Sequence, residues 1–165
     1  MNYLFYFKFI QEFKINFALR YLYFMIRFFT EDVNFNFKKK QFTKDWLKFV
    51  AGSEMRKLGN INIIFCSDNY ILDVNMKYLQ HDYFTDIITF DYCEGDVLSG
   101  DLFISVDSVR ENSLYYGTAF EQELNRVIVH GLLHLIGYDD HSDEDIKTMR
   151  SKEDYYLLCR DSMMS

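Results

Sequence analysis

The amino-acid sequence predicts an α/β (α+β) fold: a single domain in which a small mixed four-stranded sheet packs with about five helices. Two observations support this prediction. Short β-branched or aromatic runs alternate with segments of helical spacing through the first part of the chain, and three helical segments follow one another at its end. A length of 165 residues suits one domain, and no repeat or linker interrupts the chain after residue 25.

The first half of the chain alternates between predicted strands and predicted helices. Phe42, Trp46, Phe49 and Val50 have the spacing of one helix face. We expect a strand at 26–29, a helix at 41–58 that stops at Gly59, a strand at 61–66, and a helix from a Ser67 cap to about residue 79.

The second half begins with two strands and ends with three helices. We expect strands at 86–92 and 101–106, with a loop or hairpin at 93–100 between them, and then a helix at 107–116. Thr118 and Glu121 have the spacing of a capping box for the next helix, which would end at Gly137. A last helix at 143–160 would follow Ser142.

The first 24 residues have an unusual composition, MNYLFYFKFIQEFKINFALRYLYF. We expect 1–24 to be an upstream extension or a mis-assigned start, with the functional domain at 25–165 beginning at Met25. The alternative is an amphipathic segment on a membrane surface. The longest uncharged run is too short to span a bilayer and no signal peptide is evident, so no membrane partner is expected.

Composition narrows the class of protein. A net charge of −7 argues against broad electrostatic capture of nucleic acid. The best basic patch is Lys38–Lys40 with Lys44 and Lys48, although such a run is usually a solvated face. Three cysteines at unrelated spacings indicate neither a disulfide framework nor a cysteine zinc site, which favours a cytoplasmic location.

Three of the four histidines lie in one stretch, HGLLHLIGYDDH, at 130–141. His130 and His134 are four residues apart, so on a helix both can face one metal ion, although single histidines are usually ordinary core or surface residues. Gly137 lets the chain leave the helix and turn back with a third ligand. Three protein ligands and an open position are typical of a catalytic zinc site.

The third ligand has two candidates. The zinc-protease pattern H-E-x-x-H-x-x-G-x-x-H places it six residues after the second histidine, which here is Asp140. Ligand chemistry favours His141, and both remain open. Gly131 stands where that pattern has its glutamate, so a peptidase would lack its base.

The same stretch resembles the HGxLHLxGYDH signature of the YbeY family of bacterial endoribonucleases. Residues 85–90 (TDIITF) and 100–104 (GDLFI) resemble two strands of that family, and Met149 and Glu153 match its last helix. The resemblance covers about 25–160. It implies a metal-dependent hydrolase with one Zn²⁺ per chain, held by His130, His134 and Asp140. It also implies cleavage of single-stranded RNA in 16S rRNA 3′-end maturation and ribosome quality control, with ribosomal RNA and ribosomal particles as partners.

One departure from the family concerns RNA contacts. Many members have an arginine where this chain has Leu79, which leaves the phosphate contact unassigned. Lys77, His81 and Arg126 are candidates, each with an ordinary surface role as the alternative.

The catalytic base is also open. Asp86 and Asp139 are the candidates, and Asp86 could equally cap a turn. Either a metal-bound hydroxide or the RNA 2′-hydroxyl could attack phosphorus. Glu123, on the face of His130, could accept that ring's other N–H, or be an exposed helix glutamate.

Two rival functions remain. A metallopeptidase-like hydrolase would need another base. A non-catalytic ribosome-assembly factor would use the metal only structurally.

Overall fold

The computed structural model describes residues 25–164. Five helices and a four-stranded sheet make up this part of the chain, as the sequence predicted. The strands are β1 (Met25–Thr30), β2 (Lys57–Cys66), β3 (Ile87–Asp91) and β4 (Val97–Ser105). The helices are α3 (Lys40–Ser53), α4 (Asp68–Leu79), α5 (Val106–Tyr116), α6 (Phe120–Ile136) and α7 (Asp143–Met164).

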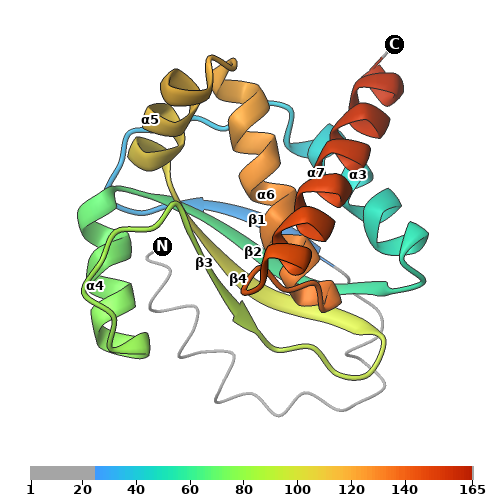
Figure 1. Ribbon diagram of the computed structural model, residues 1–165, viewed down its shortest axis with the longest axis horizontal. Helices are drawn as coiled ribbons and strands as arrows, with labels where there is room; N and C mark the ends of the chain where they lie inside the picture. The colour runs from blue at the N-terminus through green and yellow to red at the C-terminus, as the bar shows by residue number, and fades with distance from the viewer. Residues whose placement is uncertain (1–24, 165) are drawn as a thin grey trace.

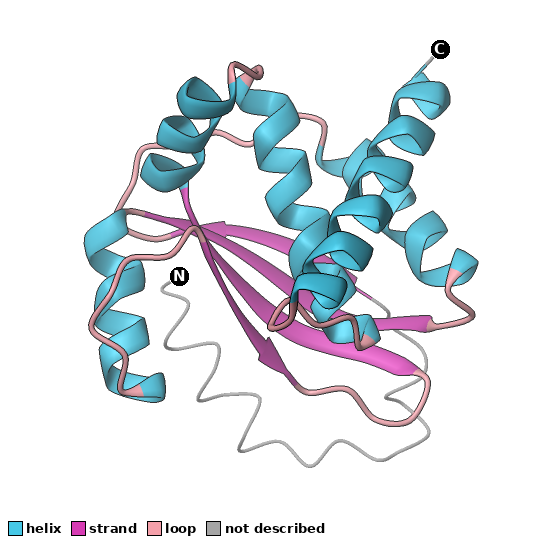
Figure 2. Cartoon of the chain, in the orientation of Figure 1, coloured by secondary structure: helices cyan, strands magenta, loops and turns pink. Residues whose placement is uncertain are grey.

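The sheet is mixed, with the order β1-β2-β4-β3. β1 runs parallel to β2 and β2 runs parallel to β4, whereas β3 is an antiparallel edge strand on β4. Figure 2 shows the sheet as one twisted layer beneath most of the helices. β2 and β4 are therefore central, and both are nearly continuous runs of buried residues, as expected for strands covered on both faces.

Side chains that alternate along the central strands point to two separate hydrophobic layers. Ile63 and Ile104 belong to the larger layer, which α3, α6 and α7 cover. Ile64 and Phe103 belong to the smaller layer on the other face, where α4 contributes Ile71 and other residues. Figure 1 shows α6 crossing the sheet between α5 and α7, with α4 set apart. α6 thus lies against the centre of the sheet, and this packing sets the orientation of the helix that carries His130 and His134.

Two predicted helix boundaries are wrong. The first helix ends at Ser53 and not at 58, because Met55 adopts a left-handed conformation (φ 55°) and the chain then enters β2 at Lys57. Gly59 lies inside β2 and is no helix stop. The last helix extends beyond Arg160 to Met164, while Ser142 caps its start by accepting a hydrogen bond from the Asp145 amide.

The predicted capping box of α6 is also wrong. Helix α6 follows Ala119, and no side chain caps it. The carboxylate of Glu121 instead pairs with Lys39 at 2.8 Å and with Arg160 at 3.3 Å, and the buried Thr118 hydroxyl has no hydrogen-bond partner in the described part of the chain. The Glu121 carboxylate therefore forms ion pairs with cations from distant segments and does not form the cap of α6 that its spacing from Thr118 predicts.

The remaining elements differ from the prediction only at their ends. β4 begins at Val97, four residues before the predicted start, because Glu94 and Val97 close a tight turn after β3. Ser67 caps α4 as predicted, and Gly117 ends α5. The prediction for 1–24 falls outside the described residues. Between residues 25 and 164, no helix combines the length and apolar character needed to cross a membrane.

Candidate metal centre

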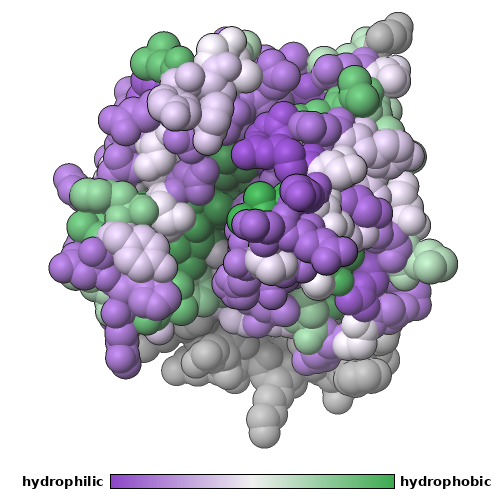
Figure 3. Space-filling view, viewed as in Figure 1, coloured by the Kyte–Doolittle hydropathy of each residue, from purple (hydrophilic) through white to green (hydrophobic). Residues whose placement is uncertain are grey.

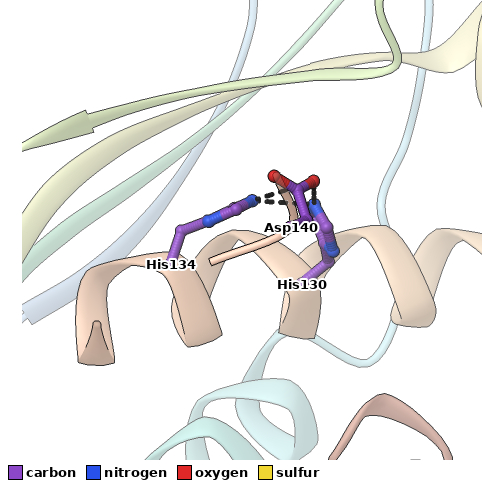
Figure 4. Close-up of side chains that lie close together, drawn as sticks. All are labelled: His130, His134 and Asp140. Atoms are coloured by element: carbon purple, nitrogen blue, oxygen red, sulfur yellow. Dashed lines mark hydrogen bonds and ion pairs between the residues drawn. The ribbon is translucent and has the colours of Figure 1, made fainter. Parts of the chain in front are cut away.

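His130 and His134 lie on one face of α6, and the turn after the helix returns toward them (Figure 4). That turn is possible because Gly137 ends α6 at φ 112°, a conformation that glycine adopts without a side-chain clash. Three residues later, Asp140 reaches the two rings. Local sequence therefore brings the three side chains toward one another: helical periodicity supplies two of them and a glycine turn supplies the third.

Three donor atoms converge at this place. The Nε2 atoms of the two histidines are 2.9 Å apart, and each lies 3.7 Å from the Oδ2 atom of Asp140. Bonds of about 2.05 Å in a tetrahedral zinc site would separate ligand atoms by about 3.3 Å, within the range of these three distances. The three residues could therefore hold one metal ion.

Hydrogen bonds on the far side of each ring orient the histidines. The Nδ1 atom of His130 lies 2.8 Å from Oε1 of Glu153, and the Nδ1 atom of His134 lies 3.0 Å from the carbonyl oxygen of Tyr138. Both partners are acceptors, so both Nδ1 atoms carry the proton and both Nε2 lone pairs face inward. This is the usual arrangement of metal-binding histidines.

Protonation also favours metal binding. Burial, together with the neighbouring His130 ring, lowers the pKa of His134 below its ordinary value of 6.5. Burial opposes ionisation of Glu153, but hydrogen bonds from His130 and Arg126 outweigh it and lower the pKa of that carboxyl. At neutral pH the His134 imidazole is therefore neutral and can bind a metal ion. The Glu153 carboxylate is ionised and accepts the Nδ1 hydrogen bond of His130.

His141 lies outside this cluster. Its side chain is 86% exposed, and its ring nitrogens lie near Asp139 (3.4 Å) and the outer oxygen of Asp140 (3.9 Å). Asp139, Asp140 and His141 form a second, more exposed group that could contact a cation. The structure thus places Asp140, and not His141, beside the two helix histidines.

Glu153 has the role that the sequence suggested for Glu123, because it accepts the hydrogen bond from the second ring nitrogen of His130. Both side chains are buried, but the carboxylate that contacts His130 comes from α7. Arg126 holds Glu153 at 2.9 Å and Asp154 at 2.7 Å, so this candidate phosphate contact is committed to two carboxylates. Glu153 reaches His130 only because α7 packs on α6. The one sequence signal for Glu153 was its match to the last helix of the YbeY family.

Asp86 precedes β3 and is half-buried. Its Oδ2 atom accepts a hydrogen bond of 3.1 Å from the Asn112 amide. Burial raises the pKa of Asp86, and the nearby His130 opposes that rise only in part. Asp139, the other candidate base, is exposed and accepts a hydrogen bond from the Asp140 backbone amide. Asp86 is therefore the more shielded of the two carboxylates.

The other candidates for RNA contact lie elsewhere. Lys77 lies over the ring of its neighbour Tyr78, and the His81 ring accepts or donates a hydrogen bond with the Tyr83 hydroxyl at 3.1 Å. In the basic run, Lys39 pairs with Glu121. None of these contacts involves the metal cluster in residues 25–164.

The packing around Gly131 leaves no space for the glutamate that the zinc-protease pattern has at this position. A Cβ atom at this position would lie 2.6 Å from Cδ1 of Ile87 and 3.0 Å from Cδ2 of Leu102. The residue after the first histidine therefore faces the sheet and not the ligands. A longer side chain would have no space in this register of α6 on β3 and β4.

Comparison with known proteins shows the family to which this chain belongs. The sequence model of the family described as Endoribonuclease YbeY matches residues 25–159. A protein of that name from Bacteroides thetaiotaomicron is 53% identical over 131 residues, which are 79% of this chain and 96% of the relative. One from Flavobacterium johnsoniae is 48% identical over 126 residues, or 76% of this chain and 91% of that protein.

A solved structure supports the fold. The solution structure of a Thermotoga maritima protein matches 81% of this chain and 87% of its own, with a TM-score of 0.58 and 30% identity. The family match extends over all nine described strands and helices up to the last turns of α7. The chain therefore belongs to the YbeY family of endoribonucleases.

Proposed function

We propose that this chain is a zinc-dependent endoribonuclease specific for single-stranded RNA. It acts in 16S rRNA 3′-end maturation and ribosome quality control, with ribosomal RNA and ribosomal particles as partners in the cytoplasm. The observation that carries the proposal is the convergence of His130 Nε2, His134 Nε2 and Asp140 Oδ2. The names of the relatives support the reaction class.

The donor set favours zinc. Two imidazole nitrogens and one carboxylate oxygen suit zinc better than magnesium or calcium, which prefer oxygen ligands. Three protein ligands leave one position open, as in catalytic rather than structural zinc sites. When bound, the ion supplies a water of lowered pKa and polarises a phosphoryl oxygen.

The protein's own groups do the remaining work. Glu153 and the Tyr138 carbonyl keep both Nδ1 protons in place, so the Nε2 atoms stay available as ligands. Asp86 is the proposed proton acceptor for the attacking water or 2′-hydroxyl, since its raised pKa brings it closer to the working pH. Asp139 is the alternative acceptor, at the exposed side of the turn.

Metal content is the first test. Elemental mass spectrometry of the full chain should find about one zinc per molecule, and His134→Ala should lose it. His81→Ala is the matched control, because His81 lies in the exposed segment after α4 and should leave zinc unchanged. Equal metal in wild type and His134→Ala would refute the proposed site.

RNA cleavage is the second test. The wild type should cut single-stranded RNA faster than duplex RNA, lose activity in EDTA and regain it with zinc. Cyclic 2′,3′-phosphate ends would identify attack by the 2′-hydroxyl. Cleavage of casein instead would favour the metallopeptidase. Bound zinc without any hydrolysis would favour the ribosome-assembly factor.

The proton acceptor has its own test. Asp86→Asn should lower the rate of cleavage while zinc content stays at the wild-type level. Because burial disfavours the Asp86 charge, the same change should also raise the urea midpoint of the metal-free protein at neutral pH. Full activity in Asp86→Asn would transfer the role to Asp139 or to the metal-bound water alone.

A further inference from the structure

Arg150 on α7 contacts Glu153, and Glu153 in turn contacts the metal-cluster residue His130. The Nη1 atom of Arg150 is 3.3 Å from Oε2 of Glu153, and the other oxygen of Glu153 contacts His130. The Arg150 side chain is nevertheless 53% exposed. A guanidinium is therefore held near the His130 end of the site while part of it faces solvent.

Arg126 differs from Arg150 although both contact the same oxygen of Glu153. The Arg126 side chain is only 17% exposed and also pairs with Asp154. Among the described residues, Glu153 is the one carboxylate within ion-pair distance of Arg150. Arg126 thus supports the Glu153 carboxylate, whereas Arg150 keeps guanidinium donors available for a ligand.

The site needs such a cation if its substrate is a polyanion. Asp86, Asp140 and Glu153 place three carboxylates near His130, in a chain of net charge −7. Glu123 adds a fourth carboxylate close to Asp86 and Glu153. Arg150 opposes the burial that raises the pKa of Glu123, so its charge is felt across this cluster. Figure 3 shows hydrophilic surface over α6 and α7 beside a hollow with a hydrophobic floor.

We propose that Arg150 binds a phosphate group of the RNA substrate beside the metal centre. The guanidinium fork matches a phosphate in two parallel hydrogen bonds. The contact of 3.3 Å with Glu153 engages one nitrogen of the fork, Nη1, and leaves the other donors for a ligand. The inference rests on the proposed function and deepens it, since it assigns the phosphate contact that the Leu79 position lacks. The contact is a second point of attachment, separated from the metal-ligand atoms by Glu153 and the His130 ring.

The test compares Arg150→Ala, Arg150→Lys and Arg110→Ala. Arg110 is a matched control: its side chain is 58% exposed and pairs with Asp107 three residues away at 3.5 Å, on α5. KM and kcat for cleavage of a single-stranded RNA are measured from about 50 to 200 mM salt. Zinc affinity and thermal unfolding are measured on the same proteins.

Arg150→Ala should raise KM about tenfold, and the slope of log KM against log salt should fall by about 0.7, the value for one phosphate contact with a single strand. Arg150→Lys should keep most of the salt slope, and Arg110→Ala should match the wild type. Zinc affinity should not change. A fall in zinc affinity with an unaltered salt slope would overturn the proposal, because Arg150 would then only support Glu153. A wild type that neither binds nor cuts RNA would instead refute the proposed function itself.

Discussion

The hydroxyl group of Tyr138 donates a hydrogen bond of 2.9 Å to the carboxylate of Glu54, 84 residues earlier in the chain. Lys152 donates to the same carboxylate at 2.8 Å, and Tyr156 is a third donor. Glu54 lies at the C-terminal end of α3, and its partners lie in the turn after α6 and on α7. One carboxylate therefore ties two helices to the turn that carries Asp140.

Tyr138 connects this cluster to the metal centre, because its carbonyl oxygen accepts the hydrogen bond from His134. Tyr138→Phe removes only the hydroxyl and should weaken zinc binding several-fold by loosening the turn. Cobalt in place of zinc should show an altered visible spectrum, which reports ligand geometry. Tyr116→Phe, on an exposed residue of α5, is the control. An unchanged cobalt spectrum and zinc affinity would limit the hydroxyl to a stabilising role.

Glu54 should make stability depend on pH. Burial opposes its ionisation, but hydrogen bonds from Lys152, Tyr156 and Tyr138 outweigh it and lower the pKa of Glu54 below 4.5. A lowered folded-state pKa adds stability above the unfolded pKa, and this stability disappears as the pH falls through the folded value. Urea unfolding should therefore show a steeper acid loss in the wild type than in Glu54→Gln. Parallel pH profiles for the two proteins would contradict the assignment.

Glu153 and Glu123 offer a matched pair. Both are glutamates buried at 4% exposure, but only Glu153 contacts His130. Glu153→Ala should lower zinc affinity about 10–100-fold, whereas Glu123→Ala should leave it unchanged. Competition with a chromophoric chelator measures both. Glu153→Gln should retain part of the affinity, because its amide oxygen can still accept the Nδ1 proton.

Asp140 and His141 are adjacent but should behave differently. Asp140→Ala should lose most bound zinc, since its carboxylate faces both histidines. His141→Ala should retain about one zinc per chain, because its ring points to solvent. Elemental mass spectrometry after dialysis distinguishes them. The opposite pattern would show that the turn rearranges to bring His141 to the metal.

Gly131 should tolerate alanine far better than glutamate. An alanine methyl would press on the flexible ends of Ile87 and Leu102, and the gain in helix propensity offsets part of that cost. Gly131→Glu would place a carboxylate against the sheet and should cost at least about 3 kcal/mol of unfolding free energy. Urea titrations measure both variants. A stable Gly131→Glu protein that cleaves casein would show that the glutamate can reach the metal after all.

Local sequence determined the parts of this protein whose causes are local. Helical spacing put His130 and His134 on one face, and Gly137 provided the turn. The number and type of strands and helices followed from hydrophobic periodicity. Element ends were less predictable: Gly59 has the appearance of a helix stop but lies in β2, because pairing with β4 extends that strand to Lys57.

Tertiary structure decided which partners support the site. Glu153 reaches His130 from 23 residues away, and Glu54 reaches Tyr138 across 84. Glu121 pairs with Lys39 and Arg160 and does not form the predicted capping box. Single-sequence patterns describe neighbours within a turn or two, whereas these contacts depend on how α3, α6 and α7 pack together. The sequence by itself therefore determined the candidate ligands, and packing determined the carboxylates and the arginine around them.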